Sequence, residues 1–186
     1  MSERGKLFYI IGPSGAGKDS LMRYARARLN GAGGIIFAHR YITRPLEVEG
    51  ENHVALTDEE FVQRLKLGCF AMHWETHGFR YGIGIEIEQW LSSGARVVVN
   101  GSRAYLDTAR KKYPELRAIL ITAAPDVLEQ RLVNRGRETP SQVKERLDRT
   151  HGLGLIPDEN LIVVINDGHI EEAGSRLLQA LGVVGS

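Results

Sequence analysis

Glycines, a lysine and hydroxyl-bearing residues gather in one short segment, Gly12-Pro13-Ser14-Gly15-Ala16-Gly17-Lys18-Asp19-Ser20. Glycines let consecutive backbone N–H groups converge on phosphate oxygens, and a following helix N-terminus adds positive potential. The Lys18 ammonium would then reach the β- and γ-phosphates of a nucleoside triphosphate. A Gly-rich turn beside an ordinary surface lysine is the alternative. The segment follows an apolar run, Leu7–Ile11, and opens a predicted helix, Lys18–Leu29, which is the context that a phosphate-binding loop (P-loop) requires.

The residue after the lysine departs from the usual P-loop pattern. Ser or Thr normally stands there and binds Mg²⁺ through its hydroxyl, whereas this chain has Asp19 followed by Ser20. A carboxylate is also a hard-oxygen ligand for Mg²⁺. Another apolar run ends at Asn100, where P-loop proteins often place an acidic metal partner. We therefore predict ATP and Mg²⁺ as cofactors, with Asp19 supplying the charge that Asn100 lacks.

Arginines recur in a later segment, Arg131-Leu132-Val133-Asn134-Arg135-Gly136-Arg137, and again at Arg146. Arg131 and Arg135 are spaced i, i+4 and so share one helix face. Guanidinium groups suit the neutralisation of charge on a phosphoryl group in transfer. A solvated basic helix face is the alternative. Beside a P-loop we predict an arginine-rich lid over about residues 136–151. We expect Arg131, Arg135 and Arg146 to assist Lys18 in catalysis, and Arg135 and Arg137 to contact ATP.

Short apolar runs alternate with helix-like segments along most of the chain. The runs are Leu7–Ile11, Ile35–Ala38, Val97–Val99, Ala118–Thr122 and Leu161–Ile165, and the helix-like segments are Lys18–Leu29, Arg103–Tyr113, Pro125–Arg135 and Ile170–Leu181. Runs without period-2 alternation are typical of strands buried on both faces of a parallel sheet. The order predicts an α/β P-loop NTPase fold with a mostly parallel five-stranded sheet and helices on both faces.

Residues 40–93 do not follow that alternation. They contain a predicted helix, Thr57–Leu67, with Thr57 as N-cap and Glu60 at the capping-box position. We interpret them as an inserted acceptor-binding lobe rather than a separate domain. The chain of 186 residues is then a single domain, 1–186, with its core at 1–39 and 94–186. A further helix is predicted at Ser141–Arg149.

Composition excludes several classes of partner. The chain has 42% hydrophobic and 25% charged residues and a formal net charge of +1, so nothing favours binding to nucleic acid or to an anionic membrane. The single cysteine, Cys69, excludes an intrachain disulfide. No apolar stretch is long enough for a signal or a membrane span, and we expect a cytoplasmic protein.

With these residues assembled, the chain resembles the guanylate-kinase group of nucleoside monophosphate kinases over nearly its whole length. The matching segments are Gly12–Gly15 with Gly17-Lys18, Thr43-Arg44-Pro45, Thr57–Phe61, His77-Gly78, Tyr81-Gly82, Arg135–Arg137 and Asn166-Asp167. The acceptor side departs from that group. Guanylate kinases have a second arginine that holds the acceptor phosphate, and it is absent after Arg44. Their tyrosine before the helix aligns with His53. Their guanine-reading glutamate aligns with Met72, and their Ser or Thr after Tyr-Gly aligns with Ile83. A purine would lose hydrogen bonds there.

The segments His39–Arg44, Glu51–His53 and Asn100–Arg103 instead resemble the ribose 1,5-bisphosphate phosphokinases of phosphonate degradation. The resemblance implies phosphorylation of that sugar phosphate by MgATP to 5-phospho-α-D-ribose 1-diphosphate. It implies acceptor contacts from Arg40, Arg44, His53, Tyr81, Asn100, Ser102 and Arg103, although Tyr81 is of a type that more often packs a core. A nucleoside monophosphate kinase, a non-catalytic interaction module and a nucleotide-dependent switch remain as alternatives.

Overall fold

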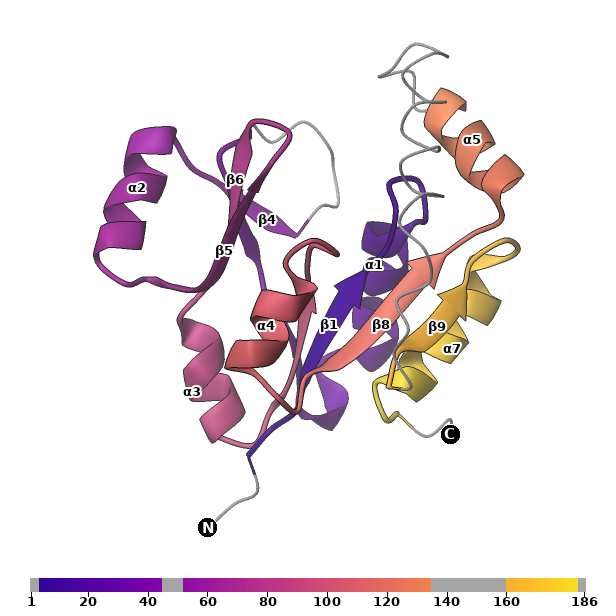
Figure 1. Ribbon diagram of the computed structural model, residues 1–186. Helices are drawn as coiled ribbons and strands as arrows, with labels where there is room; N and C mark the ends of the chain where they lie inside the picture. Colours follow the sequence, from indigo (N-terminus) through magenta and orange to yellow (C-terminus); the bar gives the residue numbers. More distant parts are fainter. Residues whose placement is uncertain (1–3, 45–51, 135–159, 184–186) are drawn as a thin grey trace.

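Five apolar strands pair in a parallel sheet. The computed structural model describes residues 4–44, 52–134 and 160–183. Within them the sheet has the order β2-β7-β1-β8-β9 (Figure 1). Its strands are β1 (Leu7–Ile11), β2 (Ile35–Phe37), β7 (Arg96–Asn100), β8 (Arg117–Thr122) and β9 (Ile162–Ile165). Every adjacent pair is parallel. The predicted five-stranded parallel sheet is confirmed, with strand ends shifted by a residue or so.

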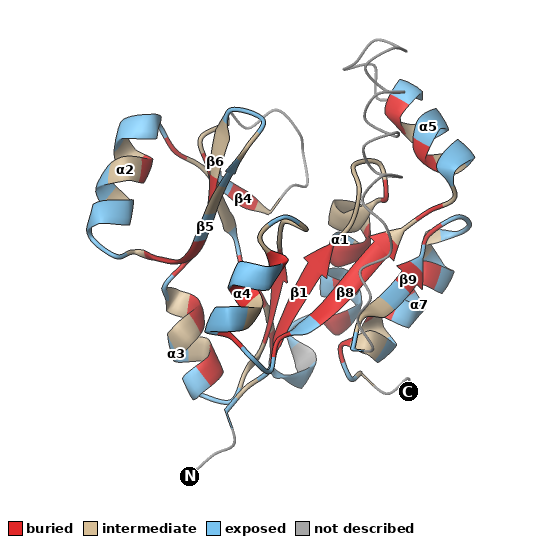
Figure 2. Cartoon of the chain, viewed as in Figure 1, coloured by how far each residue is buried: buried red, intermediate tan, exposed pale blue. Residues whose placement is uncertain are grey.

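Successive side chains of β1 point to opposite faces of the sheet, as the strand pleat requires. Phe8 and Ile10 join a core cluster with α1 (Lys18–Leu29), α5 (Pro125–Asn134) and α7 (Ile170–Ala180). Tyr9 and Ile11 join another with α3 (Glu86–Ser92) and α4 (Leu106–Lys112). Figure 2 shows the buried central strands between these helices. Helices therefore cover both faces, as predicted.

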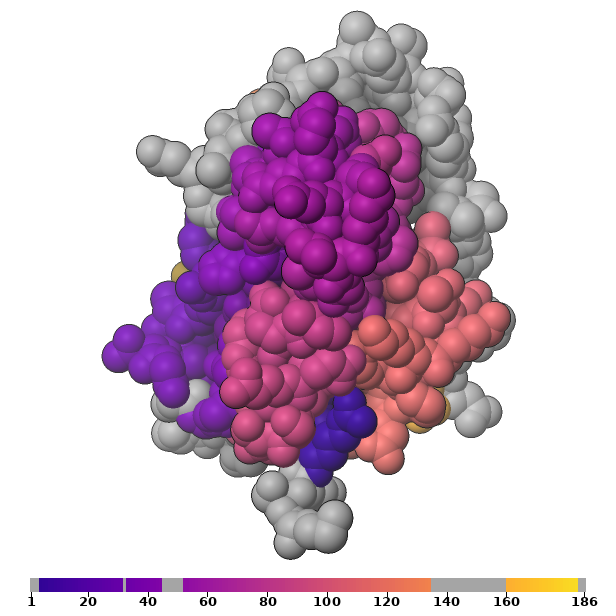
Figure 3. Space-filling model, turned by 90° about the vertical axis from the view of Figure 1, so that its left-hand side faces the viewer, coloured from indigo at the N-terminus to yellow at the C-terminus, as the bar shows by residue number. Residues whose placement is uncertain are grey.

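A mixed sheet lies beside the parallel one, in the order β4-β3-β6-β5. Its strands are β3 (Arg40–Ile42), β4 (His53–Ala55), β5 (Phe70–Thr76) and β6 (Phe79–Gly84). β3 pairs parallel with β4 and antiparallel with β6. β5 and β6 form a hairpin whose turn residues, His77 and Gly78, both have positive φ. In the side view of Figure 3 this part of the chain lies above α3.

The helix α2 (Asp58–Lys66) covers the mixed sheet. As predicted, the Thr57 side chain caps it, accepting a hydrogen bond from the backbone N of Glu60 at 3.1 Å. Phe61 is buried and stacks on Phe70 of β5, with ring centroids 4.5 Å apart. The capped helix therefore anchors to the sheet through one aromatic residue.

One helix prediction needs correction, and another lies outside the described residues. The predicted helix Arg103–Tyr113 begins only at Leu106, because residues 102–105 form a turn in which the N of Tyr105 bonds to the O of Ser102. A short 3₁₀ helix, η1 (Ala32–Gly34), precedes β2. The predicted helix Ser141–Arg149 and the lid segment 136–151 lie outside the described residues. In the part of the chain that is described, no helix has the length and apolarity needed to cross a membrane.

Candidate active site

The loop between β1 and α1 packs closely against β8. A Cβ atom at Gly12 would lie 2.0 Å from the carbonyl oxygen of Ile121, so only glycine fits there. Gly15 and Gly17 have φ of 85° and 84°, the left-handed region that glycine adopts without strain. Figure 1 shows this loop at the edge toward which β1 and β8 point. The glycine spacing of the sequence therefore has a geometric cause at each of these positions.

Lys18 lies in the first turn of α1 and folds back over the loop. Its Nζ donates hydrogen bonds to the carbonyl oxygens of Gly12, at 2.8 Å, and Pro13, at 3.0 Å. The side chain is only partly exposed. The ammonium is thus held at the loop that its predicted phosphate ligand would enter.

Asn166 supports the loop from behind. It follows β9 and is 6% exposed, and its Nδ2 donates to the carbonyl oxygen of Ala16 at 2.8 Å. A Cβ atom at Gly17 would lie 2.5 Å from that same nitrogen. The next residue, Asp167, accepts a hydrogen bond from the backbone N of Ala124. In the sequence this Asn-Asp pair was only part of a family resemblance, and the structure gives it a positioning role.

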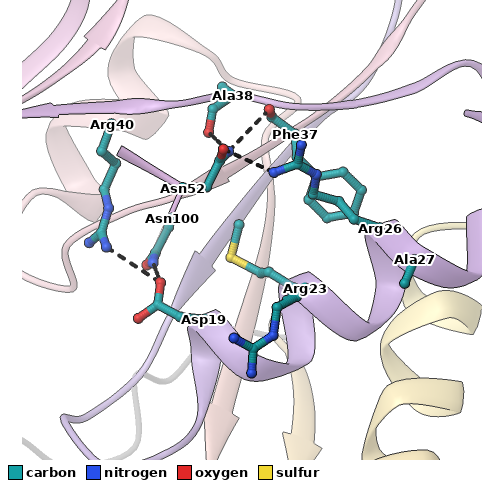
Figure 4. A pocket seen from close by; sticks show the side chains of 10 residues that line it. Asp19, Arg23, Arg26, Ala27, Phe37, Ala38, Arg40, Asn52 and Asn100 are labelled. Atoms are coloured by element: carbon teal, nitrogen blue, oxygen red, sulfur yellow. Dashed lines mark hydrogen bonds and ion pairs between the residues drawn. The ribbon is translucent and has the colours of Figure 1, made fainter. Parts of the chain in front are cut away.

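Asp19, Asn100 and Arg40 meet at the end of β7. Nδ2 of Asn100 donates to Oδ1 of Asp19 at 2.8 Å, and a guanidinium nitrogen of Arg40 lies 3.4 Å from the same oxygen (Figure 4). The Asp19 side chain is 42% exposed and that of Arg40 is 12% exposed. Asp19 and Asn100, which were expected to share one role in metal binding, are therefore in direct contact.

A pocket of about 440 Å³ extends from this contact along α1. Its lining residues are Asp19, Met22, Arg23, Arg26, Ala27, Phe37, Ala38, Arg40, Asn52 and Asn100. Asn52 spans the far end, where it accepts from Arg26 and donates to the carbonyl oxygen of Ala38. Arg23, Arg26 and Asn52 were not singled out in the sequence. The i, i+4, i+7 spacing of Asp19, Arg23 and Arg26 was the signal that could have found the two arginines.

The other acceptor residues implied by the resemblance do not line this pocket; they are Arg44, His53, Tyr81, Ser102 and Arg103. His53 is buried in β4, and Arg44 follows β3. Tyr81 is 9% exposed and stacks on Trp74, with the ring planes 3° apart. Tyr81 thus has a packing role in the mixed sheet, and its contact with an acceptor stays a prediction, as do those of the other four.

Tyr9 fixes the loop that follows Asn100. Its hydroxyl accepts from the backbone N of Ser102 at 3.0 Å and donates to the carbonyl oxygen of that residue at 3.2 Å. A Cβ atom at Gly101 would lie 2.0 Å from the Tyr9 ring. Burial raises the pKa of Tyr9 well above its usual value, so the hydroxyl stays protonated. Sequence reasoning missed this residue because a tyrosine in an apolar run gives no sign of a distant partner.

Arg131 lies on α5, the helix that packs against the P-loop. On that helix the Cγ atom of Leu132 comes within 3.3 Å of a Cβ position at Gly15. The Nη1 atom of Arg131 is buried, and no hydrogen-bond partner is recorded for it in the described part of the chain. Buried polar atoms are nearly always satisfied, so this guanidinium nitrogen is a candidate contact for an anion. The predicted partners Arg135, Arg137 and Arg146 lie outside the described residues.

The carboxylate of Asp19 fits one position of a Mg²⁺ site. Among residues 4–44, 52–134 and 160–183, no cluster of three or more His, Cys, Asp or Glu is placed to hold a metal. Mg²⁺ bound beside phosphates needs only one or two carboxylates, with water and phosphate oxygens as its other ligands. The Asp19 side chain is 42% exposed at the end of the P-loop, so it is the residue that would hold such an ion.

Residues 4–182 match the family model described as guanylate kinase. Proteins named ribose 1,5-bisphosphate phosphokinase PhnN are similar over nearly the whole chain. That of Thiobacillus denitrificans is 58% identical over 181 residues, covering 97% of this chain and 94% of that protein. That of Chromobacterium violaceum is 51% identical over 177 residues, covering 95% and 94%. That of Psychromonas ingrahamii is 47% identical over 178 residues, covering 96% and 90%.

The fold also resembles a solved structure. The crystal structure of guanylate kinase from Anaplasma phagocytophilum matches with a TM-score of 0.69 at 18% sequence identity, covering 97% of this chain and 86% of that chain. At this identity the likeness concerns the fold. It agrees with the parallel sheet, the P-loop and the additional mixed sheet described above.

Proposed function

This chain belongs to the guanylate kinase family, and from that membership we propose that it transfers the γ-phosphoryl group of ATP to ribose 1,5-bisphosphate. The products are ADP and 5-phospho-α-D-ribose 1-diphosphate. Three relatives between 47% and 58% identical carry the name of this activity, and each is covered over at least nine tenths of its length.

This choice of acceptor depends on one observation. The two positions that align with the guanine-binding residues of guanylate kinases are apolar in this chain. Met72 is 1% exposed and Ile83 is 0% exposed, and both belong to a core cluster with Ile87 of α3. Neither side chain offers a hydrogen bond to a base. A guanine in this position would lose the polar contacts that identify it, whereas a sugar phosphate has no base to recognise.

On the donor side the P-loop from Gly12 to Asp19 binds the terminal phosphates of ATP. Lys18 exchanges its bonds to the Gly12 and Pro13 carbonyls for bonds to the β- and γ-phosphates. An oxygen of the acceptor 1-phosphate attacks the γ-phosphorus, and the bond from that phosphorus to the β,γ-bridging oxygen breaks. The attacking oxygen is already ionised near neutral pH, so no general base is required. In-line positioning and charge neutralisation provide the catalysis.

The residues that neutralise charge come from separate elements. Bound Mg²⁺ would offset charge on the phosphate oxygens, and Asp19 is the residue that would hold it. Arg131 binds the γ-phosphoryl group from α5, supported by its buried and unsatisfied Nη1. Arg137 and Arg146 belong to the proposed lid, about residues 136–151, and Arg135 directly precedes it. The proposed acceptor lobe is 40–93, inserted in a core of 1–39 and 94–186.

One assay separates this function from its rivals. The protein is incubated with MgATP and either ribose 1,5-bisphosphate or GMP, and diphosphate products are followed by phosphorus NMR. We expect product from the sugar phosphate and none above background from GMP. Product from GMP alone would reject the proposal in favour of a nucleoside monophosphate kinase. ATP hydrolysis that ignores both acceptors would instead indicate a nucleotide-dependent switch.

A non-catalytic interaction module is the alternative from another class of protein. The retained P-loop, with Lys18 at 2.8 Å from the Gly12 carbonyl oxygen, argues against it. Lys18→Ala provides the control in the same assay. Its loss of product formation would show that any activity arises in this P-loop rather than in a contaminating kinase.

A further inference from the structure

The pocket along α1 carries more positive charge than the P-loop chemistry uses. Three arginines and one aspartate are the charged residues in its lining. Asp19, Arg23 and Arg26 are spaced i, i+4, i+7 on α1, so they share one face of the helix. At about 1.5 Å of rise per residue, Arg23 lies about 6 Å and Arg26 about 10 Å along the axis from Asp19. The helix therefore presents cations in a row leading away from the P-loop.

The three guanidinium groups differ in their interaction partners. Arg40 lies against Asp19, and Arg26 donates to Oδ1 of Asn52 at 2.9 Å (Figure 4). For the Arg23 side chain, which is exposed, no hydrogen bond or ion pair is recorded within the described residues. Arg23 is thus the cation of this pocket that is placed to take an anion from solution.

Asn100 provides a second indication of a ligand. It is 3% exposed and lines the pocket, and its Oδ1 is buried with no hydrogen-bond partner recorded among the described residues. The orientation of its amide is fixed, because the group that faces the Asp19 carboxylate has to be the donating Nδ2. The remaining oxygen can only accept. A ligand with a hydroxyl group at this end of the pocket would satisfy it.

We propose that this pocket holds the ribose and the 5-phosphate of the acceptor, with Arg23 binding the 5-phosphate and Oδ1 of Asn100 accepting from a ribose hydroxyl. The inference rests on the proposed function. The reacting 1-phosphate has to lie beside Lys18, which neighbours Asp19 at one end of the pocket. The opposite end of the same molecule then extends along α1 toward Arg23. The pocket volume of about 440 Å³ accommodates a pentose phosphate.

The test compares two acceptors that differ only in the 5-phosphate, ribose 1,5-bisphosphate and ribose 1-phosphate, on wild type and Arg23→Gln. Loss of one charge-assisted contact should reduce kcat/KM for the bisphosphate about tenfold in the variant. The value for ribose 1-phosphate and the KM for ATP should not change. The preference for the bisphosphate, which is the ratio of the two kcat/KM values, therefore falls about tenfold. An unchanged preference would overturn the subsite.

Arg28→Gln is the matched control. Arg28 is exposed on the same helix, lies over the Tyr24 ring and does not line the pocket. The ratio of kcat/KM for the two acceptors should be the same in Arg28→Gln as in wild type. An equal fall in both variants would show a general effect of charge on α1 and would also overturn the proposal.

A binding measurement separates failure of this subsite from failure of the proposed function. Titration calorimetry with ribose 5-phosphate, which lacks the reacting group, should show binding to wild type and about tenfold weaker binding to Arg23→Gln. If wild type turns over the bisphosphate but Arg23→Gln keeps its affinity, only the subsite is wrong. If wild type turns over no bisphosphate, the proposed function is wrong. The same titration, repeated with inorganic phosphate, then still decides whether Arg23 binds a sugar phosphate or only free phosphate.

Discussion

Nδ2 of Asn100, at the end of β7, donates a hydrogen bond to Oδ1 of Asp19, on α1, at 2.8 Å, although the two residues are 81 positions apart in the chain. Two carboxylates at that distance would repel each other unless a cation lay between them. An amide opposite the aspartate removes the repulsion and orients the carboxylate. The pair therefore keeps one negative charge beside the P-loop, carried by α1 instead of by β7.

Asp19→Asn should weaken Mg²⁺ activation. The substitution keeps the size of the side chain and removes the charge that would face the proposed Mg²⁺, so the Mg²⁺ concentration for half-maximal rate should rise about tenfold or more. Rates measured across Mg²⁺ concentrations at saturating ATP give this constant. Asp107→Asn, at an exposed position on α4, is the control and should behave as wild type. An Asp19 variant with an unaltered Mg²⁺ requirement would remove Asp19 from the metal site.

Arg131→Ala should lower kcat with little effect on stability. Its Nη1 is buried and unsatisfied in the described structure, so its loss removes no recorded hydrogen bond. Loss of one donor to the transferring group typically lowers kcat by roughly 10²–10³-fold. Steady-state kinetics and a melting curve measure the two effects. Arg176→Ala, exposed on α7, should leave kcat unchanged. A fall in melting temperature without a fall in kcat would mean that Arg131 only packs α5.

The parallel sheet could be predicted because its strands are buried on both faces. Such strands are continuous runs of Val, Ile and Leu, and the β1 prediction, Leu7–Ile11, matches the structure to the residue. The mixed sheet could not be predicted in this way. β5 changes from buried at Phe70–Met72 to partly exposed at His73–Thr76, which obscures any single period. α3 (Glu86–Ser92) was also missed.

Site residues on the P-loop could be predicted because they are consecutive in the chain. The contacts that support them join segments far apart in sequence, as in the bonds between Tyr9 and Ser102 across 93 positions. Those contacts follow from the placement of β1 between β7 and β8. Strand order is a property of the whole fold, and the periodicity of a single run does not contain it.

Tyr9→Phe should destabilise the loop from Asn100 to Arg103. The backbone N of Ser102 would lose its partner in a part-buried site, at a cost of about 0.5–1.5 kcal/mol in free energy of unfolding. Burial raises the pKa of Tyr9 in the folded chain above its unfolded value. The stabilisation is therefore complete below the unfolded pKa, about pH 10, and declines as pH rises above it. Denaturant unfolding at pH 8 and pH 11 should show a larger difference between wild type and variant at pH 8.

Asn166→Ala should loosen the P-loop, because the carbonyl oxygen of Ala16 loses the buried Nδ2 that lies 2.8 Å away. An unsatisfied buried acceptor costs about 1–3 kcal/mol, which for a chain of this size lowers the melting temperature by roughly 2–12 °C. A less ordered loop should also raise the KM for ATP, by about tenfold on the same free-energy scale. Asp167→Asn is the neighbouring control, since an asparagine there keeps an oxygen to accept from the N of Ala124. If Asn166→Ala lowered the melting temperature but left the KM for ATP equal to that of the control, Asn166 would stabilise β9 without positioning the phosphate site.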